Sequence, residues 1–137
     1  MFQHIKKLRL INKIRMNSDL KRYPSSMPFP FSKAVEANGF LFLSGQVSMC
    51  SEGKPIYGTI EEQVNVIFER ITTTLEECGS SPDKIVKATV WLSDMNHFQA
   101  FNKAYGLQFE NGFPVRSTVI SELAFGLDVE IEIQALA

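Results

Sequence analysis

Arg116 is the residue whose type and setting most clearly suggest chemistry. From Tyr23 onward the chain contains only one other arginine, Arg70, and Arg116 follows a Phe-Pro-Val segment at the start of a strand-like run. A guanidinium group presents parallel N–H donors that can hold a carboxylate through two hydrogen bonds, which suits recognition of a small acid. The alternative is a structural ion pair with an acid such as Glu132, and the residue types alone favour that ion pair.

Glu132 lies in the segment from Val129 to Leu136, where apolar residues alternate with polar ones. A period of two residues predicts a strand with one buried face, and Glu132 then points to the opposite, solvent-facing side. The pattern by itself therefore gives Glu132 an ordinary place on the surface of a sheet.

Several widespread catalytic designs lack their residues in this chain. The phosphate-binding motifs GxxxxGK[ST] and GxGxxG and the nucleophile motif GxSxG are absent. The two histidines, His4 and His97, cannot supply a metal site built from several histidines, and His97 is expected to be solvated or to cap a helix. Cys50 and Cys78 lack disulfide-framework or metal-ligand spacing, so we expect a surface thiol at Cys50 and a core residue at Cys78. We therefore predict no metal site and a reducing compartment, the cytoplasm.

Two helices and five strands are predicted around these residues. The clearest helix runs from Thr59 to Cys78, because its apolar residues fall on one face at a spacing of about 3.6 residues. Thr59 and Glu62 predict a capping box at its start, and Gly79 a left-handed residue after its end. The other predicted elements are strands at 31–36, 40–47, 85–92, 116–123 and 129–136, an Asn38-Gly39 hairpin turn, and a helix from a cap at Asp94 or Asn96 to about Gly112. This order predicts a two-layer α+β sandwich, in which two helices cover one face of a mixed sheet.

Residues 1–27 are predicted to form a basic N-terminal extension, flexible or partly helical, before a folded domain at residues 28–137. The apolar residues Phe2, Ile5, Leu8 and Ile11 or Ile14 could give a basic amphipathic helix. An organelle-targeting segment and a membrane or partner anchor are two interpretations. We favour a third, a disordered upstream extension with Met16 or Met27 as an alternative start.

The charge of the chain is divided between these two parts. Residues 1–22 carry a net charge of +6, and the remainder carries −7. An acidic body binds phosphate backbones poorly, so a nucleic-acid partner is not expected. The chain also lacks an apolar run of the length that spans a bilayer, so no membrane partner is expected.

Four segments of the body, in their order and spacing, resemble the reactive intermediate deaminase family, also called Rid or YjgF-type proteins. They are Ser44-Gly45-Gln46, Asn102-Lys103-Ala104-Tyr105, Phe113-Pro114-Val115-Arg116-Ser117 and Val129-Glu130-Ile131-Glu132-Ile133. The resemblance covers nearly the whole body, from about Pro28 to the C-terminus. It implies a chorismate-mutase-like α+β fold of the bacillus type that assembles as a homotrimer, with the sheets forming an inner barrel and three sites between neighbouring subunits.

The resemblance also implies a reaction, namely hydrolysis of enamines and imines such as 2-aminoacrylate to 2-keto acids and ammonia, without a cofactor. This is the activity of a 2-iminobutanoate/2-iminopropanoate deaminase. By position, Arg116 matches the arginine that holds the substrate carboxylate, and Glu132 matches the acid that positions the attacking water. Ser44 and Asn102 match residues that line the cleft.

This sequence departs from the family pattern at two site positions. Phe31 stands where the best-known branch has a tyrosine, so the aromatic wall is kept and a hydroxyl is lost. Thr118 stands where that branch has a cysteine, two residues after Arg116. Any contact with substrate that is made there by the backbone does not depend on the side chain and is expected to be kept. The loop at Ala124-Phe125-Gly126 contains one residue more than the common pattern.

Two further functions compete with deamination: regulatory binding of a small carboxylate without turnover, and RNA cleavage that inhibits translation.

Overall fold

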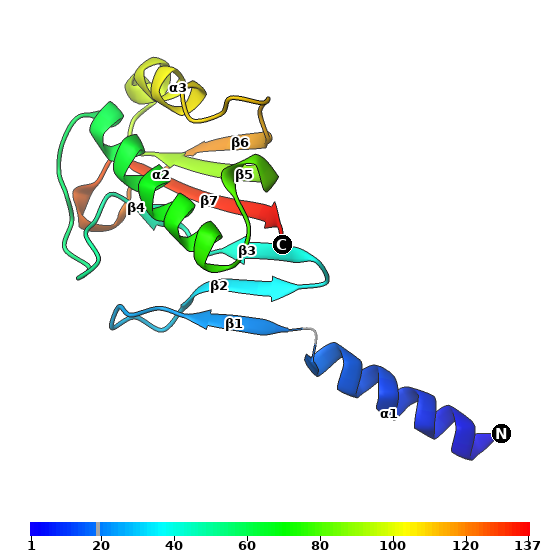
Figure 1. Ribbon diagram of the computed structural model, residues 1–137. Coiled ribbons are helices and arrows are strands. Elements are labelled where there is room, and N and C mark those ends of the chain that lie inside the picture. The colour runs from blue at the N-terminus through cyan, green and yellow to red at the C-terminus, as the bar shows by residue number, and fades with distance from the viewer. Residues whose placement is uncertain (19) are drawn as a thin grey trace.

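One mixed sheet and two covering helices make up the body of the molecule. The computed structural model describes residues 1–18 and 20–137, with side chains for 1–10 and 20–137. The helices and strands are α1 (Phe2–Ser18), β1 (Lys21–Pro24), β2 (Ser32–Ala37), β3 (Phe40–Leu43), β4 (Gln46–Val47), α2 (Ile60–Glu77), β5 (Ile85–Leu92), α3 (Phe98–Gly106), β6 (Val115–Ile120) and β7 (Val129–Leu136). The strand order is β1-β2-β3-β7-β5-β6, with β4 also paired to β7. Both α2 and α3 lie on one face of the sheet (Figure 1), which confirms the predicted two-layer α+β sandwich.

The hydrophobic core fills the layer between the sheet and these two helices. Helix α2 packs against β7 and β4, and the inward-facing residues of β7 are fully buried. Within the described part of the chain, no helix covers the other face of the sheet (Figure 1). The main buried side chains are Leu41, Val64, Ile67, Ile71, Leu75, Ala88, Val90, Phe101, Ile131 and Ile133.

Local signals placed α2 and the first hairpin correctly. The Thr59 hydroxyl accepts from the backbone N–H of Glu62, whose carboxylate accepts from the N–H of Thr59, so the predicted capping box is confirmed. Gly79 follows the helix with a φ of +78°. Asn38 and Gly39 have φ values of 55° and 83°, as a tight turn between β2 and β3 requires.

The single strand predicted at 40–47 is divided at Ser44 and Gly45. The Ser44 hydroxyl donates to the carbonyl of Ser32 at 2.6 Å, which holds this point of the chain against β2. A Cβ at position 45 would lie 2.7 Å from Oε1 of Glu130, so glycine lets the chain pass β7 without displacing this side chain. The interruption therefore comes from contacts with distant strands.

Two predicted boundaries were too late. β6 ends at Ile120 and not at Leu123, because its pairing partner β5 ends at Leu92. Helix α3 ends at Gly106 and not near Gly112. Phe109 nevertheless packs against Tyr105, with ring centroids 4.9 Å apart, so the predicted aromatic face continues beyond the helix.

The N-terminal segment contains both a helix and a strand. β1 pairs with β2 in antiparallel register, so part of the segment expected to be an extension belongs to the sheet. Helix α1 lies beyond the sheet edge in Figure 1. Among the described side chains of α1, Leu8 and Leu10 are both exposed and, two residues apart, point to different sides of the helix, so the apolar residues of this part are not confined to one face. The side chains of Ile11 and Ile14 lie outside the described residues.

In the described parts of the chain, no helix combines the length and apolar character that crossing a bilayer requires.

Candidate functional site

Arg116 lies on β6, at the edge of the sheet, and its side chain points to the face that the helices cover. In the parallel pairing of β6 with β5, Arg116 is the partner of Ala88, and Thr118 is the partner of Val90. Ala88 and Val90 are fully buried, and paired residues on neighbouring strands point to the same face. The half-buried side chains of Arg116 and Thr118 therefore face α3.

Three aromatic rings of α3 surround the guanidinium group of Arg116. Its central carbon lies 5.9, 5.5 and 5.0 Å from the ring centroids of Phe98, Phe101 and Tyr105. We call these three rings the aromatic cage. Cation–π contacts stabilise a positive charge without using its N–H donors. Among the described side chains, no carboxylate forms an ion pair with Arg116 and no acceptor takes a hydrogen bond from it. The guanidinium is thus positioned but not neutralised.

Two polar atoms of α3 are buried beside this cage without a partner. They are Oδ1 of Asn102 and the hydroxyl of Tyr105, for which the described residues supply no hydrogen bond. Burial raises the pKa of Tyr105 to about 12, although the nearby charge of Arg116 acts in the opposite direction. Tyr105 is therefore neutral at physiological pH, and it contributes a ring and an unused hydroxyl.

Glu132 lies on the opposite face of the sheet from Arg116. It pairs with Thr89 of β5, whereas its neighbours Ile131 and Ile133 are fully buried on the helix side. The structural ion pair between Arg116 and Glu132 is therefore excluded within one chain. Glu130 shares the open face, and burial, followed by repulsion from Glu132, raises the pKa of its carboxyl group.

The other two expected cleft residues lie several strands away from Arg116, toward the opposite edge of the sheet. Ser44 follows β3, and Phe31 precedes β2, which pairs with β3. β3 is separated from β6 by β7 and β5, so three strand spacings place them about 14 Å apart. One chain therefore brings Asn102 and Thr118 to Arg116, and keeps Phe31, Ser44 and Glu132 away from it.

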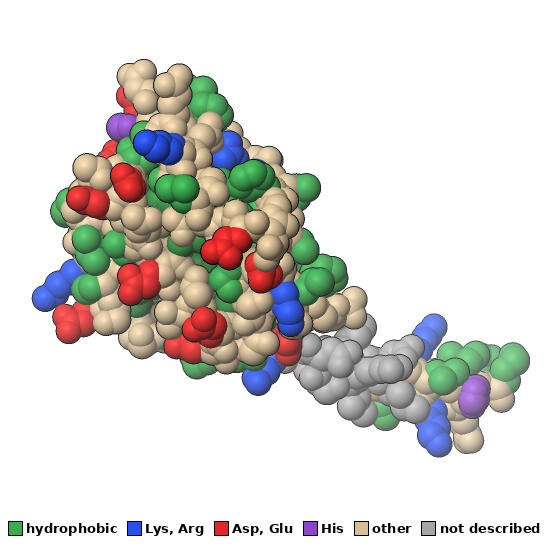
Figure 2. Space-filling model, turned by 45° about the horizontal axis from the view of Figure 1, so that its top comes forward, with side chains coloured by type: hydrophobic (Ala, Val, Ile, Leu, Met, Phe, Trp, Pro, Cys, Tyr) green, Lys and Arg blue, Asp and Glu red, His purple; other side chains and the backbone are tan. Residues whose placement is uncertain are grey.

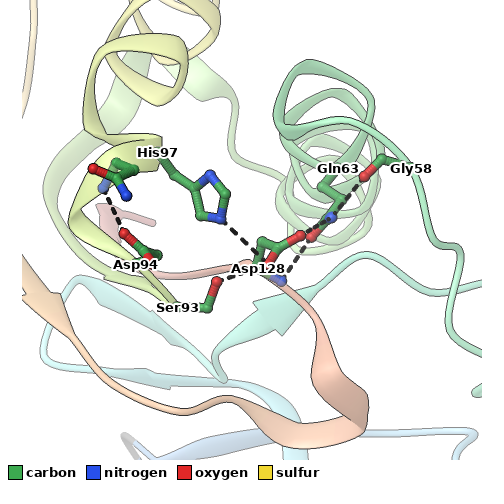
Figure 3. A network of polar contacts seen from close by, with 7 residues as sticks. Gly58, Gln63, Ser93, Asp94, His97 and Asp128 are labelled. Carbon is green, nitrogen blue, oxygen red and sulfur yellow. Dashed lines mark hydrogen bonds and ion pairs between the residues drawn. The ribbon is translucent and has the colours of Figure 1, made fainter.

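A polar network fixes the start of α3, which carries the aromatic cage. Asp128 is at its centre (Figure 3): its carboxylate accepts from the Ser93 hydroxyl at 2.7 Å and from Nε2 of Gln63 at 3.0 Å. Nε2 of His97 lies 3.5 Å from the same carboxylate. The Ser93 bond, together with Gln63 and His97, lowers the pKa of Asp128. Ser93 donates to the aspartate and not to the histidine, so this cluster is a structural brace and not a nucleophile activated by a base.

Sequence reasoning missed both the cage and the brace. It placed Phe98, Phe101 and Tyr105 on one helical face, but helical spacing does not reveal that an arginine packs against that face. Gln63 and Asp128 are 65 residues apart in the chain, and no local pattern connects them. His97 occupies the N-cap position of α3, in line with the expected capping place, but its side chain makes no capping hydrogen bond and contacts Asp128.

Comparison with known proteins places this arrangement in a family. Residues 24–137 match the family model described as endoribonuclease L-PSP. Protein MMF1, mitochondrial, of Saccharomyces cerevisiae is 37% identical over 107 residues, a match that covers 77% of this chain and 74% of that protein. A RutC family protein of Aquifex aeolicus is 40% identical over 110 residues, which covers 78% of this chain and 88% of the relative.

Solved structures agree with this placement. The crystal structure of yeast Mmf1 superposes with a TM-score of 0.76 at 34% identity and covers 86% of this chain and 93% of its own. The structure of YyfA from Yersinia pestis, described as a protein of unknown function of the conserved Rid family, has a TM-score of 0.77 at 35% identity. That match covers 85% of this chain and 94% of YyfA. This chain therefore belongs to the Rid family, whose members also carry the names YjgF, RutC and endoribonuclease L-PSP.

Proposed function

We propose that this protein hydrolyses reactive enamines and imines of small amino acids, such as 2-aminoacrylate and related 2-imino acids, to 2-keto acids and ammonia. The observation that carries this proposal is the guanidinium of Arg116, which is half-buried and held by aromatic rings, with no protein carboxylate paired to it. A charge kept without a counter-ion is suited to an anionic ligand. The 2-imino acids carry such a carboxylate next to the reacting carbon.

The proposed reaction needs few protein groups. Arg116 holds the substrate carboxylate, and an enamine first becomes an imine by proton transfer to C3. Glu132 accepts one proton from water as the water oxygen bonds to C2 of the protonated imine and the C=N π electrons move to nitrogen, which gives a carbinolamine. Glu132 then returns this proton to the amino nitrogen. The carbon–nitrogen bond breaks as the hydroxyl becomes the keto carbonyl, so nitrogen leaves as ammonia and the hydroxyl proton is released to water. A protonated imine carbon is already electrophilic, so orientation and one carboxylate supply most of the catalysis. This is the chemistry of a 2-iminobutanoate/2-iminopropanoate deaminase.

The proposed site is completed by a second copy of the chain, in a homotrimer. Arg116, Thr118 and Asn102 come from one subunit, and Phe31, Ser44 and Glu132 come from its neighbour. This division is supported by the distance between the two groups within one chain. The open face of the sheet supports assembly, because Phe40 and Phe42 of β3 are each more than 40% exposed there. A small 2-imino or 2-keto acid is the proposed ligand.

An imine-release assay tests the proposed activity. An L-amino acid oxidase generates 2-imino acids in the presence of semicarbazide, which traps imine that escapes enzymatic hydrolysis. We expect the protein to increase keto acid and lower the trapped product, and Arg116→Ala to abolish this effect. Lys103→Ala is the matched control, because it removes an exposed cation of α3 without touching the cage. An Arg116→Ala rate equal to that of the wild type would refute the assignment.

RNA cleavage is the second candidate, because the matched family model and some of the solved relatives are described as endoribonucleases. The acidic body counts against it. On the face drawn in Figure 2, acidic side chains are scattered over the described residues of the body and no broad basic patch is visible. The nuclease is favoured if the wild type cleaves a model RNA but does not hydrolyse imines, and if Arg116→Ala cleaves the same RNA at an unchanged rate. Tight binding of a keto acid without turnover would favour a regulatory carboxylate-binding protein.

We also propose the cytoplasm as the location. Two free cysteines, Cys50 and Cys78, support a reducing compartment. Relatives in two yeasts are described as mitochondrial, so the N-terminal segment is the part to test. A fluorescent fusion with and without residues 1–22 separates the two locations.

A further inference from the structure

The loop between β6 and β7 holds a phenylalanine in an unusual backbone conformation. Phe125 has a φ of 62° and a ψ of 15°, which lie in the left-handed region that bulky residues rarely adopt. Glycine adopts this region without strain, as Gly126 does in the next position with a φ of 65°. At position 125 an aromatic ring therefore stands against the preference of the backbone.

Burial does not account for this ring. Phe125 is 49% exposed, so its side chain gains little from the hydrophobic core. A bulky residue in a strained conformation that the core does not require is typical of a functional position. The function must then come from what the ring contacts outside the core.

Contacts on both sides fix the backbone from which the ring projects. The loop lies beside the segment that precedes α2 (Figure 1), and the hydroxyl of Tyr57 in that segment donates to the carbonyl of Phe125 at 2.8 Å. On the other side, Leu127 is buried, and the backbone N–H of Asp128 donates to Oε1 of Gln63 at 3.0 Å. The Phe125 ring is therefore held in a defined place.

This ring lines a cavity of about 810 Å³ between α2, the segment before β2 and the loop around β4. Phe31 and Glu130 line the same cavity, so it forms part of the shared site proposed above. The rings of Phe29 and Phe31 stack there with centroids 6.0 Å apart, and they are 40% and 42% exposed. Together with Phe125 they give the cavity an apolar wall that is open to water in a single chain.

The charges of the cavity decide which end of a substrate this wall receives. Among the lining residues, acids outnumber cations: Glu69, Glu77 and Glu130 against Lys33 and Arg70. This balance disfavours a carboxylate inside the cavity. In the proposed site the carboxylate is bound by Arg116 of the neighbouring subunit, so the side chain of the substrate is left to lie against the apolar wall.

We propose that Phe125 is a specificity-determining residue, which selects 2-imino acids with a larger apolar side chain, such as the one derived from leucine, over 2-iminopropanoate. The substrate side chain covers the exposed part of the Phe125 ring and removes both apolar surfaces from water. The single methyl group of 2-iminopropanoate covers much less of the ring. This proposal rests on the function and the shared site proposed above, and it names the substrate side chain that they leave open.

Hydrolysis of two imines tests the proposal. D-amino acid oxidase supplies 2-imino-4-methylpentanoate from D-leucine and 2-iminopropanoate from D-alanine, with semicarbazide as the trap. We expect Phe125→Ala to lower kcat/KM for the leucine-derived imine about five- to tenfold, the loss expected when about 40–50 Å² of apolar surface is no longer covered. For the alanine-derived imine, kcat/KM should change by less than about twofold. Phe125→Leu keeps an apolar side chain and should restore most of the preference.

Two further variants separate this role from a structural one. Phe2→Ala is the matched control, because it removes an exposed phenylalanine of α1 that does not line the cavity, and it should change neither rate. Phe125→Gly removes the ring and relieves the left-handed backbone, so the preference should be lost while the urea midpoint stays the same or rises. If Phe125 were only structural, Phe125→Ala would lower the urea midpoint and both rates together.

Keto acid binding separates a failure of this proposal from a failure of the proposed function. If the wild type hydrolyses imines but Phe125→Ala alters both substrates equally or neither, the role of Phe125 is refuted and the deaminase stands. If the wild type hydrolyses neither imine, the deaminase is refuted, and ligand-observed NMR with 4-methyl-2-oxopentanoate and pyruvate decides about Phe125. Weaker binding of the larger keto acid alone in Phe125→Ala would support its role. Equal effects on the two keto acids, or no binding of either, would overturn it.

Discussion

Replacing Arg116 by methionine separates a functional arginine from a structural one. Methionine keeps a flexible apolar chain against Phe98, Phe101 and Tyr105, so the rings lose only their cation–π contacts. No ion pair is broken in the described chain, and no carboxylate is left buried without a partner. We therefore expect the free energy of unfolding to fall by only about 1–2 kcal/mol, between the values for exposed and for desolvated cation–π contacts, because Arg116 is half-buried.

The expected effect on activity is much larger. A carboxylate held by two charge-assisted hydrogen bonds, each contributing about 1.5–3 kcal/mol, loses about 3–6 kcal/mol when they are removed. At about 1.4 kcal/mol per tenfold change, kcat/KM for a 2-imino acid should fall about 10²–10⁴-fold. The assay is imine hydrolysis with semicarbazide trapping, alongside urea denaturation of the same preparation.

The opposite pattern would contradict this reasoning. If Arg116 had a structural ion pair, Arg116→Met would destabilise the protein by about 3–5 kcal/mol, as removal of one partner of a buried pair does. Activity would then fall only in proportion to the unfolded fraction. The Lys103→Ala variant should change neither quantity, because that side chain is exposed.

Three further substitutions test other parts of the structure. Thr59→Ala removes the capping box of α2 and should lower the free energy of unfolding by about 1 kcal/mol in urea denaturation, with kcat/KM unchanged. Tyr105→Phe removes a buried hydroxyl that has no partner, so stability should stay the same or rise by up to about 1 kcal/mol, and a clear loss would show that the hydroxyl is bonded. Asp128→Asn tests the lowered pKa of Asp128: the wild type gains stability from it above the ordinary value of about 3.9 and loses this gain as pH falls. The stability difference between wild type and Asp128→Asn should therefore shrink below about pH 4, and a constant difference would count against the role of this carboxylate.

The sequence predicted those elements whose signals are local. The capping box at Thr59 and the turn at Asn38 and Gly39 depend on neighbouring residues, so the pattern was sufficient to place α2 and the first hairpin. The break at Ser44 and Gly45 lies where the chain contacts Ser32 of β2 and the Glu130 side chain of β7, which are distant along the chain. No pattern around position 45 could have predicted it.

The candidate site shows the same division. The residue types and the family resemblance selected Arg116 and Glu132, but their faces are set by the pairing of β6 and β7 with β5. A strand that reads Val-Arg-Ser-Thr-Val does not indicate which side is buried. Only the register with Ala88 places Arg116 under α3, and only the register with Thr89 places Glu132 on the open face.

Mixed oligomers test most directly whether the site is shared between subunits. Arg116→Ala and Glu132→Gln chains, each inactive alone, are co-expressed with different tags, and the mixed assemblies are purified and assayed. In a cyclic homotrimer, each purified mixed assembly has one of its three sites with both an intact Arg116 and an intact Glu132, so about a third of wild-type activity should return. Mixed assemblies that form but remain inactive would contradict a site in which Arg116 of one subunit works with Glu132 of the next.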